Sequence, residues 1–191
     1  SEPFGTGTGV AILRGNLAPD TCVTKPAAIH PSQHLFTGKA VVFDSEEEAT
    51  KAIVAEKIKS GDVVVIRYEG PKGGPGMREM FSAMKLLYGF GLGTTTAVIT
   101  DGRFSGTNNG CFVGHISPEA FAGGPLAIVE NGDEITIDIP NRVLTLHVSD
   151  EAIERRFKDW KAPELKYKKG HLARYAKMAQ SANTGAILKP D

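Results

Sequence analysis

The sequence predicts an α/β domain, built as a mixed sheet or a compact barrel flanked by helices. Three observations carry this prediction. Short apolar runs typical of buried strands alternate with helical patterns over the first 100 residues. Alternating segments separated by Asn-Gly and Pro-Asn turns follow between 127 and 148, as in antiparallel hairpins. At 191 residues and 41% apolar composition the chain can form one sizeable core, so we expect residues 1–191 to be a single domain.

The elements of the first half follow from local patterns. Apolar runs predict strands at 9–13, 40–43, 63–68, 95–100 and 111–116. Ser45, with Glu48 three residues later, forms a capping box and predicts a helix that Gly61 ends. Apolar residues at helical spacing predict a second helix from Met77 to Tyr88, ended by the glycines at 89–93.

The second half is predicted to be a β-meander followed by helices. The patterns favour strands at 127–129, 134–139 and 142–148. Ser149 is expected to cap a helix that runs through Trp160, and a shorter helix is expected at 171–180. We expect the tail, residues 181–191, either to dock on another surface or to fray.

Composition excludes several functional classes. The 22 Lys and Arg residues balance 22 Asp and Glu residues, so we expect no nucleic-acid binding through a basic surface. Lysines near the C-terminus are interleaved with Glu164 and Tyr167, which favours a solvated surface; they are Lys161, Lys166, Lys168 and Lys169. The sequence has no run of about 18 apolar residues and no pattern of a secretory signal, so we expect no membrane association.

Two cysteines, Cys22 and Cys111, limit the metal chemistry of the chain. They form no Cys-x-x-Cys pair and cannot by themselves hold an iron–sulfur cluster or a four-thiolate zinc ion. We expect buried thiols in a reducing compartment, the cytoplasm, or a mitochondrion or plastid in a eukaryote. Because the chain opens on Ser-Glu-Pro-Phe without an initiator Met, we expect a processed product or an excised piece.

A Gly-rich loop at 69–76 follows the predicted strand 63–68 and precedes a helix. Its backbone N–H groups and the helix dipole would favour an anion, although the loop matches neither a Walker A motif nor G-x-G-x-x-G. The alternative is a tight connection without a ligand. Glu69 could bind a hard cation such as Mg²⁺. Its alternatives are a solvated side chain or an ion pair with Lys72.

A second polar loop, 101–110, follows the next strand. Ser105 could act as a nucleophile or base there if a metal, a dipole or a neighbouring base lowered the pKa of its hydroxyl. The alternative is a turn residue, and for His115, ten residues on, a structural hydrogen bond. Arg103 and Lys25 could each pair with a substrate carboxylate, or be ordinary surface charges. Asp101 could orient Arg103 or form an Asx turn.

Five motifs together resemble the C-terminal domain of the dihydroxy-acid dehydratase family, a group that also holds sugar-acid dehydratases. The similarity runs nearly end to end. The motifs lie at 12–19 (ILRGNLAP), 67–77 (RYEGPKGGPGM), 100–106 (TDGRFSG), 114–120 (GHISPEA) and 123–127 (GGPLA).

The resemblance implies a swivelling β/β/α domain and a reaction that converts a 2,3-dihydroxy acid into a 2-keto acid. In the family an iron–sulfur cluster on the N-terminal domain acts as Lewis acid, Mg²⁺ holds the substrate, and a serine takes the C2 proton. Ser105 matches that serine and Glu69 matches the metal-binding glutamate. The implied substrate contacts are Arg103, Gly106, Gly74 and Met77. The implied partners are the N-terminal domain and a second copy in a homodimer.

The cluster-binding cysteines of the family lie outside this chain, so we expect the chain alone to hold no cluster and to lack dehydratase activity. The motifs at 100–106 and 114–120 favour the enzyme of branched-chain amino-acid biosynthesis, acting on acids such as 2,3-dihydroxyisovalerate. A sugar-acid dehydratase, acting on an aldonate or phosphogluconate, is the first alternative. A free-standing binding module that kept the fold without the chemistry is the second.

Overall fold

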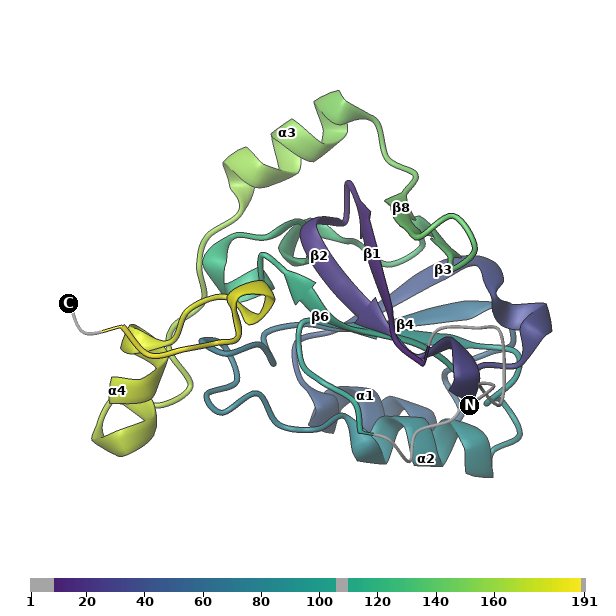
Figure 1. Cartoon of the computed structure of the whole chain (residues 1–191), viewed down its shortest axis with the longest axis horizontal. Coiled ribbons are helices and arrows are strands. Elements are labelled where there is room, and N and C mark those ends of the chain that lie inside the picture. The colour runs from purple at the N-terminus through teal and green to yellow at the C-terminus, as the bar shows by residue number, and fades with distance from the viewer. Residues whose placement is uncertain (1–8, 106–109, 190–191) are drawn as a thin grey trace, which may run out of the picture.

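The computed structural model describes residues 9–105 and 110–189, and within them eight strands close into a barrel (Figure 1). The order around the barrel is β1-β2-β6-β5-β4-β3-β7-β8. The predicted α/β class with a compact barrel is confirmed. The strands are β1 (Ala11–Gly15), β2 (Ala18–Thr24), β3 (Leu35–Phe43), β4 (Asp62–Ile66), β5 (Ala97–Thr100), β6 (Cys111–Ser117), β7 (Glu134–Asp138) and β8 (Val143–Leu146).

The barrel is mixed, and its parallel part positions the site. Strands β3, β4, β5 and β6 run parallel to one another, whereas β1, β2, β7 and β8 join them through antiparallel pairs and one parallel β1–β8 contact. The carboxyl ends of the four parallel strands therefore meet at one end of the barrel. In sheets of this kind that edge is where ligands bind.

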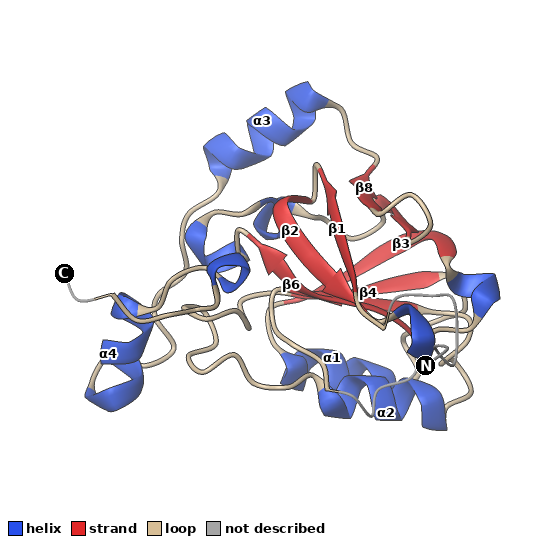
Figure 2. Ribbon diagram, in the orientation of Figure 1, coloured by secondary structure: helices blue, strands red, loops and turns tan. Residues whose placement is uncertain are grey.

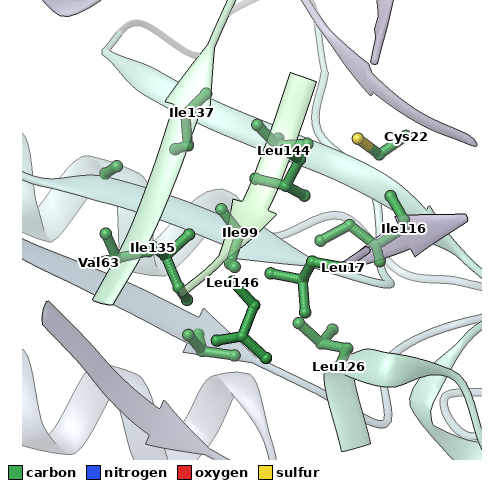
Figure 3. Close-up of a cluster of buried hydrophobic side chains, with 14 of the residues drawn as sticks. Leu17, Cys22, Val63, Ile99, Ile116, Leu126, Ile135, Ile137, Leu144 and Leu146 are labelled. Carbon is green, nitrogen blue, oxygen red and sulfur yellow. The ribbon is translucent and has the colours of Figure 1, made fainter. Parts of the chain in front are cut away.

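Side chains of the parallel strands alternate between two cores. Val63 and Val65 of β4 point into the barrel, where they pack with residues such as Ile99, Ile135 and Leu144 (Figure 3). Val64 and Ile66 point outward and pack under the helices. Because successive side chains point to opposite faces and both faces of β4 are buried, its sequence is a continuous apolar run.

Four α-helices flank the barrel in the described part of the chain. Figure 2 shows α1 and α2 side by side against one face, with α3 on the other side of the barrel. Ser45 and Ser149 cap α1 and α3 through their hydroxyls, as predicted. None of the described helices is long and apolar enough to cross a membrane. The helices are α1 (Glu46–Val54), α2 (Phe81–Gly89), α3 (Asp150–Asp159) and α4 (Gly170–Met178).

Short 3₁₀ turns complete the fold, and one of them corrects a prediction. Residues 127–129 do not form a strand; they belong largely to a 3₁₀ turn in which Pro125 fixes the first backbone angle and Leu126 enters the barrel core. Strand β2 was not predicted, and α1 ends at Val54, well before Gly61. The turns are η1 (Pro26–Ala28), η2 (Pro31–Gln33), η3 (Ala120–Ala122), η4 (Pro125–Ile128) and η5 (Ala182–Thr184).

The C-terminal segment lies at one edge of the molecule, where Figure 1 shows it in yellow. Turn η5 contacts β6 and β2, and the Gln180 N–H donates to the Ile187 carbonyl at 2.9 Å. The segment that joins α3 to α4, residues 160–169, crosses to this edge; we call it the α3–α4 linker.

Candidate active site

Four acidic side chains are buried at the barrel end where the parallel strands finish. Each follows a different parallel strand: Glu46 follows β3, Glu69 follows β4, Asp101 follows β5 and Glu119 follows β6. Their exposed fractions are 8%, 0%, 0% and 3%. Buried carboxylates are retained only when they are hydrogen-bonded or paired, so the partners of these four define the site.

Asp101 connects its own loop to the loop after β4 and to the segment after β6. Its Oδ1 accepts the Glu69 N–H at 2.9 Å, and its Oδ2 accepts the N–H groups of Tyr68 at 3.1 Å and Ala120 at 2.9 Å. Burial raises the pKa of Asp101 to about 7, and the charge of Glu119 adds to this, whereas the three N–H donors act against it. Neither sequence interpretation of Asp101 foresaw this long-range role.

The 69–76 loop binds an anion that belongs to the protein itself. The Glu119 carboxylate accepts the N–H groups of Lys72, at 2.9 and 3.1 Å from its two oxygens, and of Gly73 at 2.9 Å. Burial raises the pKa of Glu119, and these donors oppose the shift. The backbone donors that suggested an external anion are therefore used for an internal carboxylate.

Glu69 lies between two cations and is itself only 1% exposed in its side chain. Its Oε1 accepts the Glu46 N–H at 3.1 Å and an Arg78 N–H at 3.0 Å. Its Oε2 lies 3.1 Å from the Lys166 ammonium but accepts no hydrogen bond within the described part of the chain. Lys72 is not the ion-pair partner that the sequence suggested, and Lys166 is not merely a solvated lysine.

Arg78 and Gly74 hold the Glu69 carboxylate in place. Arg78 also forms a two-pronged pair with Glu47, with both N···O distances at 2.6 Å, and this pairing lowers the pKa of Glu47 to about 2. A Cβ on Gly74 would lie 2.7 Å from Glu69 Oε2, so a side chain there would displace the carboxylate. A cavity of about 160 Å³ opens at this point, lined by these residues with Lys166 and Tyr167.

Glu69 fits a hard divalent cation as one ligand of several. A buried carboxylate oxygen without a hydrogen-bond donor is the ligand type that Mg²⁺ prefers. Within residues 9–105 and 110–189 no group of three acidic, imidazole or thiol side chains converges on one point. The described residues therefore do not form a complete cation site by themselves, and further ligands would come from outside them.

The two cysteines do not fit an iron–sulfur cluster. Cys22 and Cys111 are free thiols buried in the barrel core, where Figure 3 shows Cys22 among aliphatic side chains. Burial raises the pKa of each thiol to about 12, so neither is a thiolate near neutral pH. Their place in the core matches the expected buried thiols.

Ser105 lines a separate cavity of about 290 Å³ on the outer face of β2 and β6. The lining is mainly apolar and includes Phe104 and Phe112, whose rings lie 4.6 Å apart. Lys25 and His115 line the same cavity. Ser105 and Glu69 thus lie on neighbouring loops but face different cavities.

A bulge in β6 turns His115 toward the Ser105 cavity. Thr21 pairs with Ser117 but Val23 pairs with Gly114, so β6 has one extra residue there, and His115 has a φ of +56°. Its N–H donates to the Gly102 carbonyl at 2.8 Å. Burial and the nearby Arg103 charge lower the pKa of His115, which favours the neutral imidazole.

Arg103 and Met77, two of the predicted substrate contacts, lie together. The Arg103 Nε–H donates to the Met77 carbonyl at 2.8 Å, and the Met80 N–H donates to the Arg103 carbonyl at 2.8 Å. Gly74 lies instead against Glu69, and Gly106 lies outside the described residues. Roles for these four residues toward a substrate stay predictions.

Asp101 gives a pH dependence that can be measured on the chain itself. Because burial raises its pKa from 3.8 to about 7, the folded state holds a proton that the unfolded state has lost. The free energy of unfolding should therefore fall as pH rises, by about 1.4 kcal/mol per unit between about pH 4 and 7. We expect urea unfolding curves of the wild type to show this fall relative to Asp101→Asn, which does not titrate. Parallel curves for the two proteins would contradict it.

Comparison with known proteins shows the family of the chain. Residues 1–186 match the family model described as the C-terminal part of dihydroxy-acid/6-phosphogluconate dehydratases. The chain is 56% identical to a dihydroxy-acid dehydratase of Acetivibrio thermocellus and 54% identical to one of Methanococcus aeolicus, each over 188 residues. Both alignments cover 98% of this chain but 34% of the relative, so the chain spans about a third of the curated relatives it matches. The chain therefore belongs to the dihydroxy-acid/6-phosphogluconate dehydratase family and corresponds to its C-terminal domain.

Proposed function

We propose that this chain supplies the base and one metal ligand of a dihydroxy-acid dehydratase, which removes water from a 2,3-dihydroxy carboxylic acid to give a 2-keto acid. The observation that carries the proposal is the Asp101 carboxylate, because it joins the Glu69 loop to the strand end from which the Ser105 loop departs. The residue proposed as metal ligand and the residue proposed as base thereby lie on neighbouring loops, although in the isolated domain they face different cavities. Catalytic groups need mutual positioning.

Each residue has a distinct task in this proposal. Ser105 takes the C2 proton while the C3–O bond breaks, and the departing hydroxide takes up a proton and leaves as water. The resulting enol loses its O–H proton and gains a proton at C3, which gives the 2-keto acid. An isolated serine is too weak a base, so its oxygen needs positive charge nearby; the Arg103 guanidinium, two residues before it, is one source. A divalent cation bound at Glu69 would supply further charge stabilisation for substrate oxygens.

The remainder of the enzyme must supply what this chain does not. The buried thiols of Cys22 and Cys111 do not fit a cluster, so any iron–sulfur centre would belong to the other two thirds of the enzyme. That part would be the partner that completes the site. The complete enzyme would form a homodimer. The isolated chain should have no dehydratase activity.

The Ser105 cavity favours a branched aliphatic substrate over a sugar acid. Val23, Phe104 and Phe112 offer apolar surface beside the serine, which suits an aliphatic chain better than the several hydroxyls of a sugar acid. The test is the ratio of kcat/KM for 2,3-dihydroxyisovalerate to that for a six-carbon aldonate, measured on the complete enzyme. A ratio well above one is expected; a ratio below one would replace the proposal by the sugar-acid alternative.

Filling this cavity should weaken the reaction through substrate fit. A Cβ on Gly114 would lie 3.0 Å from the Phe104 ring and 3.2 Å from the Gly102 carbonyl oxygen, so Gly114→Ala adds a methyl group at the cavity lining and displaces these neighbours. We expect kcat/KM for the branched acid to fall about tenfold, the cost of a misfit of about one methyl group. Gly89→Ala is the control, because a Cβ there meets nothing within 4 Å. An unchanged kcat/KM in Gly114→Ala would mean that the substrate does not use this cavity.

A further inference from the structure

The α3–α4 linker is attached to the end of β4 at two consecutive residues. The Trp160 indole N–H donates to the Tyr68 hydroxyl at 3.2 Å, and the Lys166 ammonium lies 3.1 Å from Glu69 Oε2. Tyr68 itself has a φ of +64°, a conformation that few non-glycine residues adopt. The linker thus covers the buried carboxylate that faces the 160 Å³ cavity.

The two cations on Glu69 are held very differently. Arg78 donates to Glu69 Oε1 and to both oxygens of Glu47, a set of bonds that fixes its guanidinium. Lys166 balances the charge on Oε2 without forming a hydrogen bond to it, and its side chain is 36% exposed. Exposure does not distinguish the two cations, since the Arg78 side chain is 46% exposed. A single ammonium on a flexible stem is nevertheless released more readily than a guanidinium bound to two carboxylates.

A buried carboxylate needs a cation in every state of the protein. Glu69 keeps Arg78 as a partner on Oε1, but loss of Lys166 would leave the buried Oε2 with neither a hydrogen bond nor an adjacent cation, which is unfavourable. A divalent ion and an ammonium repel each other when both contact one oxygen. Binding of one therefore weakens binding of the other at Oε2.

We propose that Lys166 is a positioning residue that occupies the cation position at Glu69 Oε2 and leaves when a divalent cation binds there. This inference rests on the proposed role of Glu69 as a metal ligand. Lys166 keeps the carboxylate oriented while the cation is absent, and it lowers cation affinity by competing for the oxygen. Arg78 stays on Oε1 in both states.

The exchange links the cation site to the linker. When Lys166 leaves Glu69, residues 161–169 lose one of their contacts to the barrel, while Trp160 keeps its bond to Tyr68. Because coupling between two events is reciprocal, a linker held more firmly should weaken cation binding by the same factor. The mobility of the linker should therefore depend on whether the cation position is filled by the metal or by the ammonium.

The test is cation affinity of the complete enzyme, measured with Mn²⁺ by electron paramagnetic resonance and with Mg²⁺ by calorimetry. Lys166→Met removes the competing charge and keeps most of the stem. We expect it to bind both ions about tenfold more tightly than the wild type. Lys166→Arg keeps a cation and should bind no more tightly than the wild type. A merely structural role for Lys166 predicts the opposite sign, weaker binding in Lys166→Met.

Controls separate this inference from the proposed function. Lys168→Met is the matched variant, because Lys168 pairs with Glu164 on the surface of the same linker, and its affinity should equal that of the wild type. Hydrogen exchange in 161–169 should quicken on addition of Mg²⁺ in the wild type and not in Lys166→Met. Unchanged or weaker binding in Lys166→Met, with binding strongly weakened in Glu69→Gln, would overturn the competition alone. Full affinity in Glu69→Gln would overturn both the ligand role and the competition.

Discussion

Replacing Ser105 by Ala should lower kcat of the complete dehydratase by about a thousandfold or more. Loss of a general base typically has an effect of this order. The substitution removes one oxygen beside an apolar cavity and changes no apolar contact of Phe104 or Phe112. Substrate affinity and cation affinity should therefore stay within threefold of the wild type. The loss belongs to the chemical step if KM changes little while kcat falls.

The control for this variant is Ser82→Ala. Ser82 lies exposed at the start of α2, outside both cavities, and uses its backbone N–H rather than its hydroxyl to contact Glu46. It should leave kcat unchanged. Exchange of the substrate C2 proton with solvent should also cease in Ser105→Ala, because that exchange requires the same base. Turnover within tenfold of the wild type would remove Ser105 as the base.

Local patterns were sufficient for most elements but not for closure of the barrel. The apolar run at 63–66 and the capping serines at 45 and 149 each have local causes, and the structure contains the elements they predict. Closure depends on β1 meeting β8, a contact between Arg14 and Val143 that no local pattern contains. Residues 127–129 are apolar because they fill the barrel end, and apolar content alone does not distinguish that role from a strand.

The candidate site likewise combines features visible in local sequence with contacts between distant parts of the chain. Glu69 and Asp101 stand out because they directly follow buried strands, and Ser105 stands out through its motif. Their partners come from distant parts of the chain: Asp101 accepts the N–H of Ala120, which follows β6, and Glu69 lies against Lys166 of the α3–α4 linker. Nothing in the spacing of these residues signals the pairing, since it depends on how the parallel strand ends meet. A buried glutamate does, however, require a nearby cation, and the lysines at 161–169 are among the cations of the chain that could provide it.

Replacing Glu69 by Gln should be the second severe change, and it acts through the cation. The Gln side chain keeps nearly the same shape but loses the charge, and its amide would turn donors toward Arg78 or Lys166. We expect the affinity of the complete enzyme for Mg²⁺ and Mn²⁺ to fall about a hundredfold. Substituting a residue that only hydrogen-bonds to a metal ligand causes a loss of this size or smaller. Turnover at a fixed cation concentration should fall with it.

The backbone around Glu69 should survive this substitution, and that makes the result interpretable. The Asp101 carboxylate holds the Tyr68 and Glu69 N–H groups, and neither bond involves the Glu69 side chain. Glu56→Gln, on the exposed residue after α1, is the charge-matched control and should behave as the wild type. If Glu69→Gln loses turnover while cation affinity is kept, the carboxylate serves only to hold Arg78 and Lys166. If raising the cation concentration restores turnover, the carboxylate acts as a ligand, because a purely structural defect would not respond to the metal.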